Sequence, residues 1–400
     1  MVCRVGMRRL LALGGRKFSI DAFMAGQSDG FYFDFTRTDR HFQEHTGPTL
    51  ADDIGESIGL ALDQRTWGSG TLAQVLAAQP ELVANGDFSS ALSGWTAVGV
   101  NIPTLAAVGG RWRATASGSA GGWFGGYTVL TDLTIGKTYR VAVQATLQSG
   151  WTSFSNFVLT VMDGAGATSI VGAIRSTAGL LEMYFVATAT SHAVRLRAEG
   201  AYVNGVSYAE FDDLSVKLVP GYSALQSTGT MKPTRQTSGA KFDGSDDNLL
   251  TTYYATSGAN FIAASVSVPA TLSAVQVIAG ASGSGANRTF LAIDTSGRVC
   301  AGVGSDSTTV HVGTTDLRGT DTVIALSYDG TTVRLFAGST LEYSGPQAST
   351  PTTTIPYRIG SLNSNGTAAS FSAAAIKRIV VGREFLTTPQ FAQLAPALRG

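Results

Sequence analysis

The sequence contains few residues whose type and spacing could do chemistry, and the most suggestive run is His41-Phe42-Gln43-Glu44-His45. Two histidines and a glutamate at this spacing can bind and activate zinc when they project from one face of a helix. Here Thr46-Gly47-Pro48 follows at once, and no helical pattern of apolar residues surrounds the run. We therefore interpret it as a surface turn rather than a zinc site.

Paired acids for glycoside hydrolysis are not evident either. That reaction needs two carboxyl groups about 5 to 9 Å apart on either side of the scissile bond. Beyond residue 220 the only glutamates are Glu342 and Glu384, which are too far apart in sequence to lie along one strand. No phosphate-binding glycine loop occurs. The sequence predicts that the protein is not an enzyme.

Composition excludes several other classes. The 28 basic residues balance 28 acidic ones, whereas a nucleic-acid binder would carry a basic surplus. Only the start of the chain has charged residues of one sign, which are basic, and a short basic helix is expected over residues 4–13. No run of eighteen apolar residues predicts a membrane span. Cys3 and Cys300 are too far apart to suggest a disulfide framework, which favours assembly in the cytoplasm.

The elements that must position any site are expected to be strands. Short β-branched and aromatic runs recur every eight to twelve residues, separated by turn signals such as Asp163-Gly164 and Asn204-Gly205. Glycine is abundant, at 48 residues, without a collagen period. The pattern predicts an all-β protein with two tandem antiparallel β-sandwiches of the jelly-roll type.

Three regions are expected. Residues 1–80 form a small irregular segment for docking and oligomerisation, with strands at Phe31–Phe35 and Ser57–Asp63 and a helix at Thr71–Ala78. This segment is too poor in apolar residues to fold alone, so Phe31, Phe33, Phe35 and Phe42 need a neighbour or a partner subunit. Residues 81–219 and 220–400 form the two sandwiches, and the chain ends in a helix from Pro389.

The two sandwich regions resemble known binding modules. Residues 82–219 resemble galactose-binding-like carbohydrate-binding modules through Asn85-Gly86-Asp87-Phe88, Gly94-Trp95 and Phe211-Asp212-Asp213-Leu214. Residues 240–390 resemble concanavalin-A-like or laminin-G-like lectin domains through Phe242-Asp243-Gly244-Ser245-Asp246-Asp247 and Leu326-Ser327-Tyr328-Asp329-Gly330. Both resemblances imply β-sandwich folds that bind sugars.

Residues 31–63, placed ahead of such modules, resemble phage and prophage tail or head fibre proteins. This resemblance implies a virion appendage subunit that is assembled in the host cytoplasm. Its partners would be other virion proteins and the host cell-surface polysaccharide to which it attaches the particle. The unpacked aromatics of the N-terminal segment predict a homo-oligomer, with a trimer first. A polysaccharide depolymerase and a purely structural decoration protein remain alternatives.

Aromatic side chains are the candidate sugar contacts, because the apolar faces of sugar rings stack on aromatic rings. Trp123 and Trp151 are flanked by small residues and are expected in loops, with Phe124 and Tyr127 beside them. Trp95 is expected in the core. The alternative for Trp123 and Trp151 is packing at a rim or a subunit contact.

The module resemblance also implies a structural calcium ion. Asn85 and Asp87 on the first strand and the Asp212-Asp213 pair on the last, Asp212 above all, would bring oxygen ligands together, as calcium requires. The alternative is a set of solvated carboxylates at strand ends. Asp246-Asp247 is expected to mark a turn.

Overall fold

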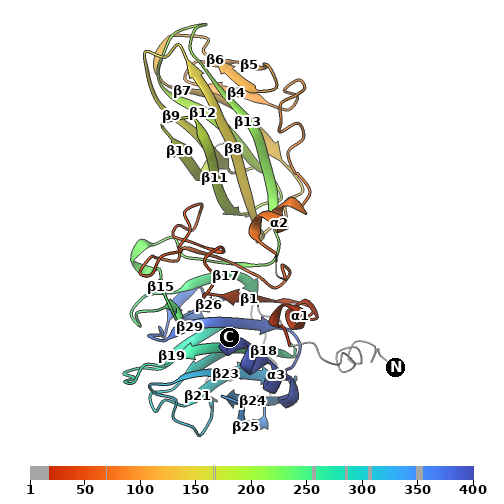
Figure 1. Ribbon diagram of the computed structural model, residues 1–400, viewed down its shortest axis with the longest axis vertical. Coiled ribbons are helices and arrows are strands. Elements are labelled where there is room, and N and C mark those ends of the chain that lie inside the picture. The colour runs from red at the N-terminus through yellow and green to blue at the C-terminus, as the bar shows by residue number, and fades with distance from the viewer. Residues whose placement is uncertain are drawn as a thin grey trace, which may run out of the picture.

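The computed structural model describes residues 18–400 except 69, 165, 167, 255–257, 284–286, 305–308 and 348–354. It consists of two bodies joined at a narrow waist (Figure 1). Each body is built from two β-sheets that enclose a hydrophobic core. The prediction of an all-β protein with two antiparallel sandwiches is confirmed.

The upper body in Figure 1, which we call the inserted sandwich, comprises residues 81–219. Its first sheet has the order β10-β9-β12-β7-β4 and its second has the order β11-β8-β13-β6-β5. The strands of the first sheet are β4 (Thr96–Gly99), β7 (Ala120–Leu130), β9 (Ser153–Met162), β10 (Ser169–Arg175) and β12 (His192–Tyr202). Those of the second are β5 (Thr104–Ala107), β6 (Trp112–Thr115), β8 (Thr138–Ser149), β11 (Gly179–Val186) and β13 (Tyr208–Val219).

The lower body, which we call the base sandwich, is built from residues 18–64 and 220–400. Its first sheet contains β1 (Gly30–Asp34), β15 (Thr234–Gln236), β16 (Gly239–Lys241), β18 (Asn260–Ser267), β23 (Asp321–Tyr328), β24 (Thr332–Ala337), β25 (Thr340–Pro346) and β29 (Ala375–Gly382). Its second sheet contains β2 (His41–Phe42), β3 (Leu60–Leu62), β14 (Ser223–Leu225), β17 (Leu249–Tyr254), β19 (Gln276–Ser282), β20 (Arg288–Ile293), β21 (Val299–Gly304), β22 (His311–Val312), β26 (Pro356–Ile359), β27 (Leu362–Ser364) and β28 (Thr367–Ala369).

The N-terminal residues belong to the base sandwich, which differs from the predicted separate segment over 1–80. Strand β1 pairs with β29 from Gly30 opposite Gly382 to Asp34 opposite Arg378. Gly30 is required at this contact, because a Cβ there would lie 2.0 Å from the carbonyl oxygen of Val381. Phe31, Phe33 and Phe35 are fully buried in the base core. The neighbour that these aromatic residues need is therefore the C-terminal half of the same chain. The predicted trimer depends on these residues lacking a packing partner within the chain, and that reason no longer holds.

The inserted sandwich interrupts the base sandwich between two adjacent strands. The chain leaves after β3 and returns at β14, and these strands pair with each other from Leu60 opposite Leu225 to Leu62 opposite Ser223. A domain whose ends lie close together can be inserted at such a point without disturbing the sheet around it. The two sandwiches are thus nested in the chain rather than separated by a single linker.

The helices are short and lie outside the sheets. Helix α2 (Leu72–Ala77) begins at a capping box made by Thr71 and Gln74, which confirms the helix predicted over 71–78. It packs against β13 at the waist. Helix α3 (Thr388–Arg399) begins at a similar box and buries Phe391, Leu394 and Leu398 on one face, as predicted. Helix α1 (Ile20–Ala25) packs in one hydrophobic cluster with the buried face of α3. A 3-10 turn covers Gly229–Met231. The basic helix expected over residues 4–13, and Cys3, lie outside the described residues.

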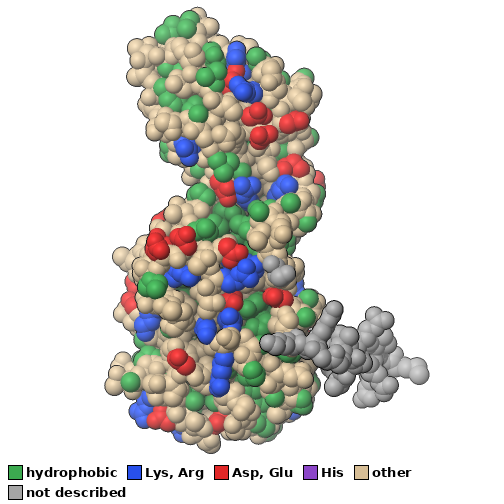
Figure 2. Space-filling model, viewed as in Figure 1, with side chains coloured by type: hydrophobic (Ala, Val, Ile, Leu, Met, Phe, Trp, Pro, Cys, Tyr) green, Lys and Arg blue, Asp and Glu red, His purple; other side chains and the backbone are tan. Residues whose placement is uncertain are grey.

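A buried cluster fixes the two bodies to each other, and we call it the junction cluster. The Tyr184 ring of the inserted sandwich packs at a tilt against Phe42 of the base with ring centroids 4.9 Å apart, and the Tyr184 backbone N–H donates to the Thr46 carbonyl at 2.8 Å. Space-filling atoms show apolar side chains at the waist (Figure 2). The junction cluster consists of Phe42, Leu60, Leu62, Trp67, Leu76, Tyr184 and Val219.

Asp63 ties the two connecting strands together at the same junction. Its carboxylate accepts backbone N–H groups from Tyr32, Arg65 and Tyr222 at 2.8–2.9 Å. Burial raises the pKa of this carboxyl group to about 6, while the three N–H donors oppose that shift. The outgoing and returning chains are therefore held by one side chain, which favours a fixed orientation of the inserted sandwich.

Candidate functional site

The first sheet of the inserted sandwich turns one row of polar and aromatic side chains away from the core. On β12, Val194, Leu196 and Ala198 belong to the core, so Arg195 and Arg197 project from the opposite face. The same alternation on β7 places Phe124 and Leu130 inside. We call the outer row, which consists of Trp123, Tyr127, Arg195, Arg197 and Glu199, the Trp123 face.

Strand register brings the members of the Trp123 face together. Arg195 lies opposite Tyr127, and Glu199 lies opposite Trp123. Arg197 lies opposite Gly125, where a Cβ would stand only 2.0 Å from the Leu196 carbonyl oxygen. Because Gly125 has no side chain, nothing on β7 separates Trp123 from Tyr127 on this face. The guanidinium carbons of Arg195 and Arg197 lie 5.0 and 5.2 Å from the centre of the Trp123 ring system.

The two arginines differ in their partners. Arg197 pairs with Glu199 at 2.8 Å, and Asn156 donates to the other Glu199 oxygen at 3.3 Å. Arg195 forms no hydrogen bond or ion pair with any residue that the structure describes, and its buried Nε has no partner. Burial and then the neighbouring Arg197 charge lower the pKa of the Arg195 guanidinium, and the Glu199 charge opposes that shift only in part. The Trp123 face therefore offers a half-buried aromatic ring beside a cation that has no ion-pair partner among the described residues.

The four aromatic residues predicted to contact sugar divide into two pairs. Trp123 lies in strand β7 rather than in a loop, and with Tyr127 it is half-buried on the outer face. Phe124 is fully buried in the core, so it cannot stack on a ligand. Its ring stacks on Trp151 with centroids 5.0 Å apart and an interplanar angle of 10°.

Trp151 lies in the loop after β8, as predicted, but its side chain packs against other residues of the inserted sandwich. Its indole N–H donates to the Tyr208 carbonyl at 2.9 Å, and its ring lies edge-on to Tyr202. Trp95 packs against Phe88 and the fully buried Trp112, in agreement with the predicted core role. Sequence reasoning missed Arg195 and Arg197, although their alternation with Val194 and Leu196 was a visible signal.

The predicted calcium ligands are only partly brought together. Asn85 and Asp87 line a shallow hollow with Glu81 and Asp213. Asp212 does not line that hollow, and its carboxylate lies 4.0 Å from the Arg111 Nε. The Asn85 side-chain amide is already hydrogen-bonded to the backbone, because it donates to the carbonyls of residues 90 and 91 and accepts from the Ser90 N–H. Calcium at this hollow stays a prediction, and a rise in the melting temperature of the inserted sandwich on adding calcium would test it.

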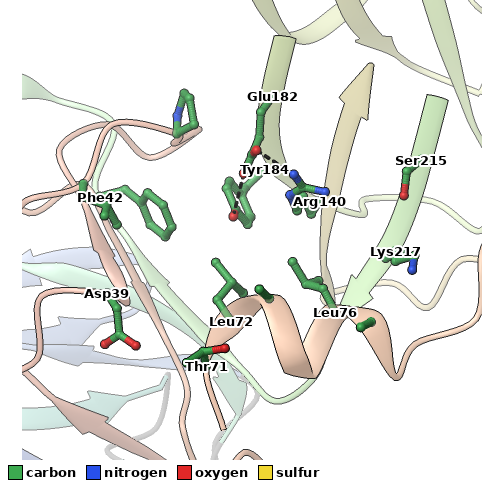
Figure 3. Close-up of a pocket in the computed structure, with 14 residues that line it drawn as sticks. Asp39, Phe42, Thr71, Leu72, Leu76, Arg140, Glu182, Tyr184, Ser215 and Lys217 are labelled. Atoms are coloured by element: carbon green, nitrogen blue, oxygen red, sulfur yellow. Dashed lines mark hydrogen bonds and ion pairs between the residues drawn. The ribbon is translucent and has the colours of Figure 1, made fainter. Parts of the chain in front are cut away.

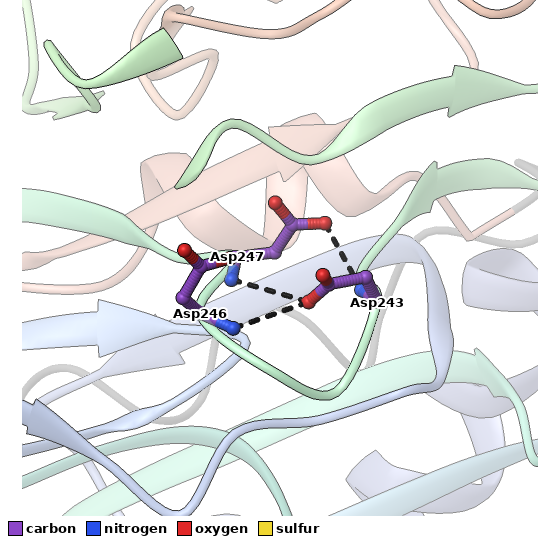
Figure 4. A group of neighbouring side chains, drawn as sticks. All are labelled: Asp243, Asp246 and Asp247. Atoms are coloured by element: carbon purple, nitrogen blue, oxygen red, sulfur yellow. Dashed lines mark hydrogen bonds between the residues drawn. The ribbon is translucent and has the colours of Figure 1, made fainter. Parts of the chain in front are cut away.

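A second acidic group lies in the base sandwich, where Asp243, Asp246 and Asp247 approach within 4.8 Å of one another (Figure 4). The Asp243 carboxylate accepts the backbone N–H groups of Ser245, Asp246 and Asp247 at 2.8–3.3 Å. This geometry is that of a turn held by an aspartate side chain, as the sequence predicted for Asp246-Asp247. Burial, followed by the Asp243 charge, raises the pKa of Asp247 to about 7.

The zinc-like run lies in strand β2 and the turn after it, so its side chains do not share one face of a helix. His41 is buried against Phe35, and its Nδ1 contacts the Arg37 carbonyl at 2.8 Å. Burial lowers the pKa of His41 to about 4. Glu44 pairs with Lys232 at 2.6 Å. These contacts are structural ones.

A cleft of about 620 Å³ lies between the two bodies (Figure 3). Its apolar wall includes Leu72 and Leu76 of α2, and its polar wall carries Arg140, Glu182 and Tyr184. Arg140 pairs with Glu182 at 2.6 Å, and the Tyr184 hydroxyl donates to Glu182 at 3.0 Å. Because these polar groups already satisfy one another, we interpret the cleft as the margin of the junction cluster.

Among the comparisons with known proteins, only the comparison with solved structures finds similar proteins. No protein family and no curated protein matches the sequence. A carbohydrate-binding module, CBM40, of the Ruminococcus gnavus IT-sialidase, solved with bound α2,3-sialyllactose, is 19% identical with a TM-score of 0.31, over 35% of this chain and 84% of that one. A pentraxin from Limulus polyphemus is 15% identical with a TM-score of 0.30, over 38% and 78%.

The binding domain of botulinum neurotoxin serotype D is 9% identical with a TM-score of 0.31, over 43% of this chain and 49% of that one. Likenesses of this degree do not carry a ligand from those proteins to this chain. Among the described residues, no helix has the length and apolar character needed to span a bilayer.

Proposed function

We propose that this protein binds a surface polysaccharide through the Trp123 face of its inserted sandwich. The observation that carries this proposal is the pair of half-buried aromatic residues, Trp123 and Tyr127, on a regular sheet face beside hydrogen-bonding side chains. Aromatic faces stack on the apolar faces of sugar rings, and charged or amide groups bind the ring hydroxyls. Glu199 and Asn156 supply acceptors and donors at that position.

The arrangement of the two bodies supports presentation of this face. Helices α1 and α3 and both sheets of the base lie together, while the inserted sandwich extends from the base beyond the waist (Figure 1). The junction cluster holds that extension in place. A rigid arm loses little conformational entropy when it binds, and several copies on one particle would gain strength by effective concentration.

We further propose that the particle is a virion and that the protein is a fibre or spike subunit that attaches it to a host cell. The support is the resemblance of residues 31–63, followed by lectin-like modules, to phage fibre proteins. Homo-oligomerisation is part of this proposal, and light scattering at micromolar concentration would test it. A stable monomer would contradict it.

The binding proposal is tested by screening purified bacterial surface polysaccharides in affinity gel electrophoresis with the full chain. Trp123→Ala should reduce affinity about 10-fold or more, because one stacked ring contributes on the order of 1–2 kcal/mol. Tyr254→Ala is the matched control, since Tyr254 is an exposed aromatic residue of the base sandwich. Absence of any binding, or equal loss in the two variants, would contradict the proposal. Release of reducing ends during incubation would instead indicate a depolymerase.

A further inference from the structure

Arg195 stands apart from the other arginines of the inserted sandwich. Four of those six side chains pair with acids, and Arg175 donates to the Leu180 carbonyl. Only Arg195 has no polar partner among the described residues. The four paired arginines are Arg111 and Arg113 with Glu210, Arg140 with Glu182, and Arg197 with Glu199.

The surroundings of Arg195 compensate its charge only in part. The Trp123 face contains two cations, Arg195 and Arg197, and one anion, Glu199, which is already paired with Arg197 at 2.8 Å. The Trp123 ring attracts both guanidinium groups, but a cation–π contact at a partly exposed site stabilises by only about 0.5–1 kcal/mol. A partly buried cation beside a like charge is electrostatically unfavourable in the free protein. An anion brought to this face would relieve that cost.

The geometry specifies the kind of anion. A guanidinium group presents a planar fork of N–H donors that matches the two oxygens of a carboxylate. This fork lies beside two aromatic rings, Trp123 at 5.0 Å and Tyr127 directly across the strand pair. A ring stacked on either aromatic residue would bring a carboxylate substituent within reach of Arg195. Free inorganic anions would make no use of the aromatic rings.

We propose that the polysaccharide bound by the Trp123 face is acidic and that Arg195 receives the carboxylate of a sugar ring stacked on Trp123 or Tyr127. This inference rests on the proposed binding function and names the ligand class for that site. Uronic and sialic acids both supply such a carboxylate. Arg195 is the specificity-determining residue, while Trp123 contributes to binding whatever the charge of the sugar.

The test compares each acidic polysaccharide with its own carboxyl-reduced form, in which the backbone is the same and the charge is gone. Alginate and polygalacturonate supply uronates, and polysialic acid supplies sialates. The full chain should bind at least one acidic polymer about 10- to 100-fold more tightly than its reduced form, as expected for a charge-assisted hydrogen-bonded pair. Which polymer binds distinguishes the two sources of carboxylate.

Variants assign the effect to Arg195. Arg195→Gln should lose that 10- to 100-fold preference and bind the acidic and reduced forms alike, and Arg195→Lys should keep part of it. Arg111→Gln is the matched control, because it removes the same charge from the turn before β6 of the other sheet, and Glu210 keeps its second partner Arg113. It should retain the full preference. Circular dichroism melts verify that each variant is folded.

Several outcomes would overturn the inference. Equal affinity of the wild-type chain for the acidic and reduced forms would refute it and leave the proposed function standing. An unchanged preference in Arg195→Gln would refute the role of Arg195. Displacement of the bound acidic polymer by duplex DNA at equal charge concentration would show general anion binding instead. Failure to bind any polysaccharide, neutral or acidic, would refute both the inference and the proposed function.

Discussion

Replacing Phe33 by alanine should destabilise the base sandwich, because β1 is an integral strand of that body. The Phe33 side chain is fully buried, and its ring lies 5.0 Å from Phe31 and 6.2 Å from Phe35. Removing a buried phenylalanine costs about 3–5 kcal/mol through lost burial and the cavity that remains. We expect a loss of that size in the free energy of unfolding of the base.

The assay can separate the two bodies, because the five tryptophans lie between positions 67 and 151. Four of them belong to the inserted sandwich and Trp67 to the junction cluster, so fluorescence reports the inserted sandwich. Calorimetry or far-ultraviolet circular dichroism reports both bodies. For Phe33→Ala, the calorimetric transition of the base should move to lower temperature more than the fluorescence transition does.

Ile54→Ala is the matched control, because Ile54 lies in the same N-terminal stretch with a side chain that is 65% exposed. Such a surface change should alter stability by less than about 0.5 kcal/mol. A loss below about 1 kcal/mol in Phe33→Ala would refute the reasoning. So would a fragment of residues 220–400 that unfolds at the same temperature as the base does in the full chain.

Three further predictions concern the junction, the acidic turn and the connecting strands. Tyr184→Ala should remove the 4.9 Å contact with Phe42 and let the inserted sandwich move, which small-angle scattering would show as a larger maximum dimension; an unchanged profile would contradict a rigid junction. The folded-state pKa of Asp247 is raised to about 7, so the folded protein holds this proton more tightly than the unfolded chain does. The free energy of unfolding should therefore fall by on the order of 2–4 kcal/mol as pH rises from 4 to 8. In urea titrations Asp247→Asn should reduce this pH dependence, and an equal pH dependence in the variant would contradict the prediction. Asp63→Ala leaves three backbone N–H groups without their acceptor. The free energy of unfolding, measured in urea, should fall by about 2–4 kcal/mol. A fall below about 0.5 kcal/mol would show that these contacts do not stabilise the junction.

Much of the fold could be predicted from local patterns. Alternation identified the strand at Phe31–Phe35, and the apolar spacing identified the face of α3 with Phe391, Leu394 and Leu398. The partner of β1 could not be predicted, because β29 lies more than 300 residues away and nothing in either strand specifies the other. The insertion of one sandwich within the other was therefore not predicted, since it depends on that long-range pairing.

The candidate site shows the same division. Small flanking residues suggested that Trp123 and Trp151 lie in loops, but Gly121, Gly122 and Gly125 lie inside strand β7. Neighbouring positions of a strand face opposite sides, so Phe124 could not share an exposed surface with Trp123. Arg195 and Arg197 alternate with core residues within one strand, so their shared face could have been predicted. Their approach to Trp123 depends on the pairing of β12 with β7 and could not.

The orientation of the inserted sandwich connects the fold to the proposed function. The strands that leave and re-enter the base pair with each other, and Asp63 binds both connections. The junction cluster buries the remaining contact. The Trp123 face is thus built on a sheet that is fixed relative to the base, which is the arrangement that a presented binding surface needs.

The most direct test is a structure of the full chain with an oligosaccharide taken from the polysaccharide that it binds most tightly. We predict a sugar ring stacked on Trp123 or Tyr127 with a carboxylate at the Arg195 guanidinium. A ligand bound only at the base sandwich, in the cleft beside α2, or at the outer surface of the β8–β13 sheet would contradict the account.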